Sequence, residues 1–161
     1  MMKNLFYICI LSLLFFSSCK SGSSMFSSSK SGSGYKGISR VRTYEFTHPD
    51  VPTAFDGAFI SDLHYRSLFK EKGLANLVKL LNNQHADALL IGGDLHEGCE
   101  YVQPLLAALS GVKTPMGTYV VLGNNDYEAC YDDIVRGLQK YGMHLLEHKV
   151  DTLRKNGQQI L

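Results

Sequence analysis

Three short apolar runs in the middle of the chain show little alternation of polar and apolar residues. They cover residues 54–60, 86–91 and 118–122. Runs of this length and composition are typical of strands that are covered on both faces. Polar residues or glycines follow each run and would stop a strand there. The pattern therefore predicts three buried strands.

Between and after these runs, apolar residues recur every three or four positions, which is the spacing of an amphipathic helix. This spacing predicts helices over 68–81, 102–109 and 134–141. Gly142 is suited to ending the last of them. The flanking segments are interpreted as an edge strand at 41–46, a strand at 143–153 and a hairpin turn at 155–157.

Strands that alternate with helices indicate β-α-β units and a largely parallel sheet. The expected fold class is therefore α/β with a mostly parallel sheet. In such sheets, ligands bind beyond the carboxyl ends of the strands. The residues that directly follow the strands are the place to look for chemistry.

The first residues have the pattern of an export signal. Lys3 precedes an apolar run over 5–16, which two small residues and Cys19 follow. Twelve helical residues reach about 18 Å, well short of the ~30 Å hydrocarbon core of a bilayer. The segment fits the apolar region of a signal peptide better than a spanning helix, and we expect residues 1–18 to be a signal peptide.

The end of this segment, Phe16-Ser17-Ser18-Cys19, resembles the lipobox of bacterial lipoproteins, although that family usually has Leu where Phe16 stands. The resemblance implies that Cys19 is lipidated and becomes the first mature residue. Acyl chains would hold the protein firmly, because each buried CH₂ contributes about 0.8 kcal/mol. We therefore expect an exported, bacterial membrane-anchored lipoprotein that faces the periplasm or the cell exterior. Plain secretion and an uncleaved anchor are the alternatives.

Residues 19–35 consist mostly of Ser and Gly. Such a segment cannot bury enough apolar surface to offset the entropy of ordering it, so we expect a flexible tether. The folded domain is then residues 36–161, which is enough for one domain and not two.

Composition and charge exclude several classes of protein. Of the 161 residues, 45% are hydrophobic and 19% are charged, which rules out a wholly disordered chain. Sixteen Lys and Arg oppose fifteen Asp and Glu, a net charge of +1, so no basic surface indicates nucleic-acid binding. Four Cys are too few for a disulfide scaffold. The absence of a P-loop or a Gly-x-Gly-x-x-Gly motif argues against nucleotide-binding folds.

Polar residues stand at the end of each predicted central strand: Asp62-Leu63-His64, then Gly93-Asp94, then Gly123-Asn124-Asn125-Asp126. Parallel strands would bring all three groups to one edge of the sheet. Carboxylate, imidazole and amide ligands together suit Mn, Fe or Zn. Asp62 and His64 are two residues apart, so on a strand both would face the same way and bind one metal.

Each motif alone is usually a turn or a surface pair. In this order, and about thirty residues apart, the three are far more specific. Residues 60–64, 92–95 and 122–126 resemble the first three motifs of the calcineurin-like metallophosphoesterases. Phe55-Asp56-Gly57 resembles the membrane-associated bacterial phosphodiesterase branch. The resemblance covers residues 41–161 and implies the N-terminal half of that family's α-β-β-α sandwich.

This resemblance implies a hydrolase of phosphate mono- or diesters with two divalent metal ions (Mn, Fe or Zn). By the family's pattern, Asp62 and His64 bind the first metal, Asp94 bridges both, and Asn124 binds the second. Two cations about 3.5–4 Å apart polarise a phosphoryl group and lower the pKa of a bridging water. Asp126 is expected to support the site.

The sequence departs from the family at Asn125, where the family usually has a His near the leaving group. Asn125 donates a hydrogen bond but does not titrate. The loss of general-acid help typically costs about 10² to 10⁴ in rate, and less for a weakly basic leaving group.

A second departure lies toward the carboxyl end. The family adds a late His and a Gly-His-x-His motif, but here only His144 and His148 follow Asn125. Both precede the turn at 155–157, and we interpret them as surface residues. We therefore expect a truncated version of a longer protein, with one face of its sheet uncovered. A non-catalytic fragment or pseudoenzyme is the alternative to an active hydrolase, and a ligand-binding α/β module without metal is a third.

Residues beside the motifs are weaker candidates. We consider Arg66 as a phosphate clamp, His96 and Glu97 as lining of the substrate edge, and Tyr127 as a stacking partner for a substrate ring.

Cys99 and Cys130 should lie in neighbouring loops, and an exported protein meets oxidising conditions. Two free thiols are favoured here, with a disulfide as the alternative. The substrate stays open among nucleotides, lipid headgroups and phosphoproteins. The expected partners are a small phosphate ester or a lipid headgroup, together with the membrane through the N-terminal anchor.

Overall fold

The computed structural model describes residues 6–11, 29–31, 41–46, 53–66, 70–128 and 130–160. In 6–11 and 29–31, and at residue 160, only the position in the sheet is described. The strands are β1 (Phe6–Leu11), β2 (Ser29–Ser31), β3 (Val41–Phe46), β4 (Phe55–Ile60), β5 (Ala88–Ile91), β6 (Thr118–Val120), β7 (His144–Leu145), β8 (Leu153–Lys155) and β9 (Gln158–Ile160). The helices are α1 (Glu71–Gln84), the 3₁₀ helix η1 (Cys99–Tyr101), α2 (Val102–Leu109), α3 (Asn124–Tyr127) and α4 (Tyr131–Lys140).

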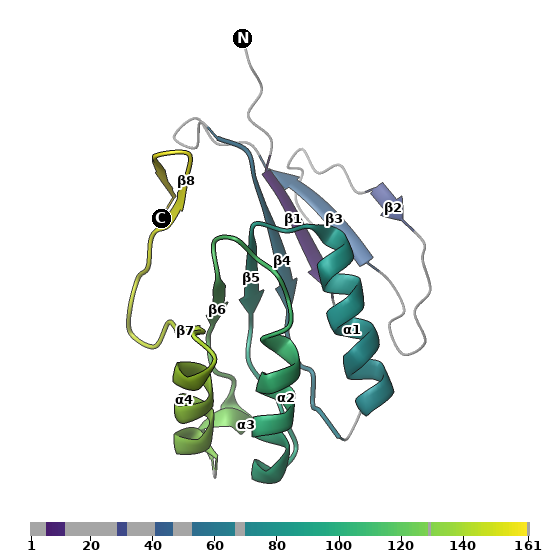
Figure 1. The fold of residues 1–161 in the computed structure, drawn as a ribbon, viewed down its shortest axis with the longest axis vertical. Coiled ribbons are helices and arrows are strands. Elements are labelled where there is room, and N and C mark those ends of the chain that lie inside the picture. The colour runs from purple at the N-terminus through teal and green to yellow at the C-terminus, as the bar shows by residue number, and fades with distance from the viewer. Residues whose placement is uncertain are drawn as a thin grey trace, which may run out of the picture.

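One sheet has the order β2-β3-β1-β4-β5-β6-β7, and β8 and β9 form a separate hairpin. Strands β4 to β7 run parallel. Their register pairs Ile60 with Ile91, Ile91 with Val120, and Val120 with Leu145. The four strands therefore end level with one another, at the lower edge of the sheet in Figure 1. The expected α/β fold with a mostly parallel sheet is confirmed.

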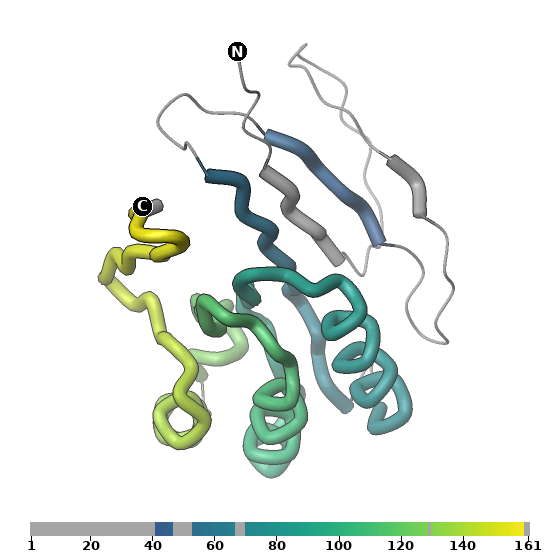
Figure 2. The backbone as a smooth tube through the Cα atoms, turned by 45° about the horizontal axis from the view of Figure 1, so that its top comes forward, coloured from purple at the N-terminus to yellow at the C-terminus, as the bar shows by residue number. Residues whose placement is uncertain are grey.

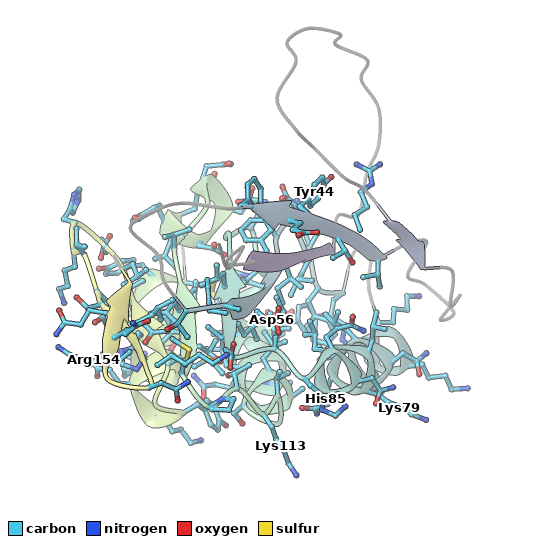
Figure 3. The ribbon with its side chains drawn as sticks, turned by 90° about the horizontal axis from the view of Figure 1, so that it is seen from above. Tyr44, Asp56, Lys79, His85, Lys113 and Arg154 are labelled. Carbon is cyan, nitrogen blue, oxygen red and sulfur yellow. A yellow bond between two sulfur atoms is a disulfide. The ribbon has the colours of Figure 1, made fainter. Side chains whose placement is uncertain are left out.

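Helices α1, α2 and α4 lie side by side along one face of this sheet (Figures 1 and 2). In the view from above, β3 lies on one side of the molecule and helices α1, α2 and α4 lie on the other (Figure 3). Alternate strand residues point toward the helices and form one buried cluster with them. Its members include Ala58, Ile60, Leu89, Ile91 and Val120 of the strands and Leu77, Leu105, Leu109, Ile134 and Leu138 of the helices.

The opposite face of the sheet is covered in part, whereas we had expected it to be uncovered. A small cluster of Phe55, Ala88 and Tyr119 lies there, and Leu153 of the C-terminal hairpin packs against it. Lys155 Nζ lies 2.6 Å from Asp87 Oδ2 and ties the hairpin to the sheet. The same Asp87 oxygen accepts the Asp56 backbone N–H at 2.8 Å.

Several predicted elements agree with the structure. Helix α2 spans the predicted residues, and Gly142 has a φ of +66° after α4. Asn156 and Gly157 both have positive φ, at 53° and 78°, as the predicted hairpin turn requires.

Other expectations were wrong. Strand β3 is not an edge strand, because β2 pairs with its outer side. Residues 143–153 form no continuous strand, only β7 and the first residue of β8. Helix α1 begins at Glu71 and not at residue 68, and it continues past the predicted end at residue 81 to Gln84, where His85 with φ 54° ends it.

At the N-terminus, the apolar segment that we predicted as a signal peptide contributes β1, which pairs with β3 and β4. Ser29–Ser31 in the predicted tether pairs with β3. Cys19 lies outside the described residues. Whether the leader is removed and Cys19 lipidated stays a prediction. Among the helices of the described segments, none is long and apolar enough to cross a membrane.

Candidate metal centre

The segments that follow β4 and β5 run alongside each other beyond the sheet edge. Asp62 N–H donates to Gly93 O at 2.9 Å, His64 N–H to Asp94 O at 3.1 Å, and Tyr65 N–H to Leu95 O at 3.0 Å. These bonds continue the parallel pairing past the last strand residues. They hold the first two motifs next to each other.

Asp62, His64 and Asp94 each offer one ligand atom, and these atoms lie within 4.8 Å of one another. The Asp62 side chain is exposed, and the other two are half-buried. Two carboxylates this close repel each other, and a divalent cation between them would offset that repulsion. Two oxygens and one imidazole nitrogen form a donor set that suits a first-row divalent metal. The residues present therefore fit the metal that the sequence motifs imply.

The backbone reaches this arrangement in an unexpected way. We had assumed that strand alternation would turn Asp62 and His64 to one side, but β4 ends at Ile60. Asp62, His64 and Asp94 instead have positive φ values of 53°, 41° and 52°. For a residue other than glycine this conformation costs about 1–3 kcal/mol, and such strain is concentrated at functional sites.

Two glycines let the second and third motifs touch. Gly93 has a φ of +88°, and a Cβ there would lie 2.1 Å from the Gly123 backbone nitrogen. A Cβ on Gly123 would lie 2.2 Å from Asp94 Oδ1. A side chain at either position would push the Asp94 carboxylate out of place.

Asp126 connects the loop that carries Asp94 to the loop that carries Gly123. It is fully buried. Its Oδ2 accepts the N–H groups of Asp94 at 2.8 Å and Gly123 at 2.9 Å, and its Oδ1 accepts that of Leu95 at 3.0 Å. The bond from Gly123 also caps the first turn of α3. Asp126 therefore fixes the backbone that carries Asp94.

The two asparagines of the third motif lie beside the cluster. Asn125 donates its backbone N–H to Asp94 Oδ1 at 3.1 Å, and its Nδ2 is 3.5 Å from His64 Nδ1. Asn124 is exposed, and its Nδ2 donates to Asn125 Oδ1 at 2.9 Å. The structure thus brings Asn125 against the cluster and places Asn124 next to it.

Glu97 is a site residue whose partner the sequence did not reveal. Its Oε1 contacts His64 Nδ1. A histidine that binds a metal commonly donates its other ring N–H to a carboxylate, which sets the ring's orientation. Its position three residues after Asp94 was visible, but its pairing with His64 depends on how the two loops lie together.

Arg66 and His96 lie near the site in ways we did not expect. Arg66 Nη2 pairs with Glu71 Oε1 at 2.8 Å, and its guanidinium lies 5.2 Å from the Tyr101 ring centroid. His96 is only 4% exposed and accepts the Gly98 N–H at its Nδ1, at 3.1 Å. Its Nε2 lies 3.8 Å from Asp126 Oδ1. Burial therefore does not favour the predicted contact of His96 with substrate.

The last two histidines lie away from these loops along the chain. His144 stacks on Tyr119 at 4.7 Å and lies 3.2 Å from Asp151. His148 is exposed, with a φ of 51°.

Cys99 and Cys130 form a disulfide, so the favoured interpretation as two free thiols was wrong. Their Cα atoms are 5.2 Å apart, within the range that a disulfide spans without backbone movement. The sequence showed that the loops are neighbours but not that these two positions face each other. The bond links the segment after Asp94 to the segment after Asn124.

Comparisons with known proteins agree with this geometry. Residues 58–157 match the family model described as calcineurin-like phosphoesterase. The chain is 33% identical over 88 residues to an uncharacterized metallophosphoesterase of Helicobacter pylori strain J99 and 32% identical over 88 residues to one of strain 26695. Each match covers 54% of this chain and 24% of the relative, so the match spans about a quarter of the relatives' length. No solved structure gave a significant match. Because the family model covers well over half of the chain, and the ligand cluster lies within the matched residues, the chain belongs to the calcineurin-like phosphoesterase family.

Proposed function

We propose that this domain hydrolyses phosphate mono- or diesters with the help of two divalent metal ions, Mn, Fe or Zn. The observation that carries the proposal is the cluster of Asp62, His64 and Asp94, whose ligand atoms lie within 4.8 Å of one another. When bound, such ions polarise the phosphoryl group and make a nearby water more acidic. Asp62 and His64 would hold the first ion, Asp94 would bridge both, and Asn124 would contribute to the second.

The remaining residues position these ligands. Glu97 orients the imidazole of His64 through Nδ1, and Asp126 holds the backbone of Asp94. Asn125 lies within 3.5 Å of His64 and can donate a hydrogen bond to an ester oxygen. Because Asn125 does not titrate, no proton reaches the leaving group from this position. The proposed substrates are therefore esters with weakly basic leaving groups.

A metal titration combined with an activity assay tests the proposal. Wild-type protein is expected to bind Mn²⁺ in calorimetry and to cleave bis-p-nitrophenyl phosphate. Asp94→Asn should lose both, because one carboxylate of the cluster becomes an amide. Asp133→Asn removes an acidic side chain that pairs with Arg136 on the exposed side of α4 and should lose neither. Wild-type protein that binds no metal would overturn the proposal.

A non-catalytic domain is the second candidate. The observation that favours it is Asn125, which lies against His64 where the family usually has a histidine and which does not titrate. In this alternative the chain binds metal but leaves the ester intact. The same experiment separates the candidates, since Mn²⁺ binding without turnover supports the second.

We also propose that the protein is exported and anchored by a lipid on Cys19. The support is the sequence pattern of residues 1–19. Expression in a bacterial host with detergent phase separation tests it. The wild type should partition into the detergent phase with a lipid mass on Cys19, and Cys19→Ala should lose both.

A further inference from the structure

A pair of tyrosines stands next to the metal centre. Helix α3 is a single turn that contains Asn124, Asp126 and Tyr127. Residues three apart on a helix lie on the same side, with their Cβ atoms about 5–6 Å apart. Asn124 and Tyr127 are both exposed, whereas Asp126 faces the interior. The Tyr127 ring therefore stands beside Asn124, on the solvent side of the candidate centre.

This ring is held in place by two partners. It stacks on Tyr131, the first residue of α4, with 5.9 Å between centroids and 15° between planes. Tyr131 Oη donates to Glu147 Oε2 at 2.5 Å, and the Tyr127 hydroxyl also bonds to Glu147. Glu147 lies just beyond the end of β7, which is level with the ends of β4, β5 and β6. The tyrosines and the ligand cluster therefore lie at one edge of the sheet.

Tyr127 is nevertheless 49% exposed, although it is large and aromatic. Tyr131 covers one side of its ring, and the exposed remainder is available to a ligand. A rigid aromatic surface of this kind binds a planar ring at little cost in conformational entropy. The nearby Glu147 carboxylate would repel an anion, so the anionic phosphate is directed to the metal ligands and an uncharged ring to the tyrosines. Hydrogen bonds from the two tyrosines lower the pKa of Glu147, which keeps it ionised at neutral pH.

We propose that Tyr127, backed by Tyr131, is a binding site for an aromatic ring of the substrate. The proposal rests on the proposed function and narrows its substrate class to phosphate esters that carry a planar ring. Asn125 supports the same substrate class independently, because without a titrating group there the leaving group must be weakly basic. An aryl ester has a weakly basic phenolate as its leaving group. A nucleoside di- or triphosphate also offers a weakly basic leaving group, phosphate, but through its phosphoanhydride bond and not through its ester bond.

Binding of two non-hydrolysable phosphonates tests the site without relying on turnover. Phenylphosphonate and methylphosphonate share the anionic group and differ in the ring. With the Mn²⁺-loaded full chain, we expect phenylphosphonate to bind about three- to tenfold more tightly in calorimetry. Tyr127→Leu should abolish this preference. Tyr127→Phe should keep it, because the ring stays. Tyr141→Leu, at the other end of α4, is the matched control and should also keep it.

The outcomes are distinct. If both phosphonates bind the wild type equally, or if Tyr127→Leu keeps the preference, the ring site is overturned while the proposed function stands. If neither binds, the proposed function fails and the ring site falls with it. Adenosine 5′-monophosphate separates the two ring sources. A loss of its affinity in Tyr127→Leu that is larger than the loss for phenylphosphonate assigns the site to a nucleobase, and a smaller loss assigns it to an aryl group.

Discussion

Replacement of Asp126 by Asn is the sharpest test of how this protein builds the candidate metal centre. The side chain is fully buried and accepts three backbone N–H groups from two different loops. An amide of the same shape keeps one acceptor oxygen and replaces the other with a donor. The change therefore probes hydrogen bonding without creating a cavity.

The magnitude follows from the geometry. The favourable orientation places the amide oxygen where Oδ2 accepts two N–H groups, at 2.8 and 2.9 Å. The amide NH₂ then faces the Leu95 N–H, which in the wild type donates to Asp126 Oδ1 at 3.0 Å. One bond is lost and a buried donor is left without an acceptor. Hydrogen bonds to charged groups contribute about 1.5–3 kcal/mol, and an unsatisfied buried donor costs about 1–3 kcal/mol. We expect Asp126→Asn to lower the free energy of unfolding by about 2–4 kcal/mol.

Urea denaturation of the oxidised protein, followed by circular dichroism, measures this loss. Asp133→Asn is the matched control. That carboxylate lies 2.5 Å from Arg136, but both side chains are well exposed, so its loss should cost less than about 1 kcal/mol. Affinity for Mn²⁺ should also fall in Asp126→Asn, because the bond that holds the Leu95 backbone, directly after Asp94, is lost. A variant whose free energy of unfolding lies within about 0.5 kcal/mol of the wild-type value would show that Asp126 does not hold the two loops together.

Three further changes have defined outcomes. Asn125→His should raise the kcat for an alkyl phosphodiester by about 10²-fold and change the kcat for an aryl diester little, because histidine can protonate a strongly basic leaving group. Equal gains in the two kcat values would contradict this. Replacing Cys99 and Cys130 together by Ser removes a disulfide between positions 31 residues apart and should lower the free energy of unfolding in urea by roughly 3–4 kcal/mol. The wild-type protein with this disulfide reduced should unfold like the variant. Burial, then the neighbouring Asp87, raise the pKa of Asp56 above its usual 3.8, so its contribution to stability is present below that pH and is lost as the pH rises through the folded value. The difference in unfolding free energy between Asp56→Asn and the wild type should therefore favour the variant more at pH 7 than at about pH 3.5. Urea unfolding midpoints that show the opposite pH dependence would refute this sign.

Much of the fold and the candidate ligand cluster could be predicted along the chain, because both depend on local pattern. Apolar runs and helical spacing predict the alternation of strands and helices. Residues at the ends of parallel strands must then meet at one edge, which is how Asp62, His64 and Asp94 were found. Where local pattern was weak, as over 143–153, the prediction failed: pairing with β6 extends β7 over only two residues.

Features that depend on contact between distant segments could not be read from the residues. The left-handed backbone at Asp62 and His64 is held by bonds to residues 93 and 94, and strand alternation did not predict it. The Glu97–His64 contact, the bonds from Asp94 and Leu95 to Asp126 and the Cys99–Cys130 disulfide likewise each join positions about thirty residues apart. Their geometry is set by how closely two loops pack, which at Gly93 and Gly123 leaves no room for a Cβ. Residue types and their order along the chain were enough to predict the candidate metal ligands, whereas the groups that orient them became apparent only once the loops were packed together in three dimensions.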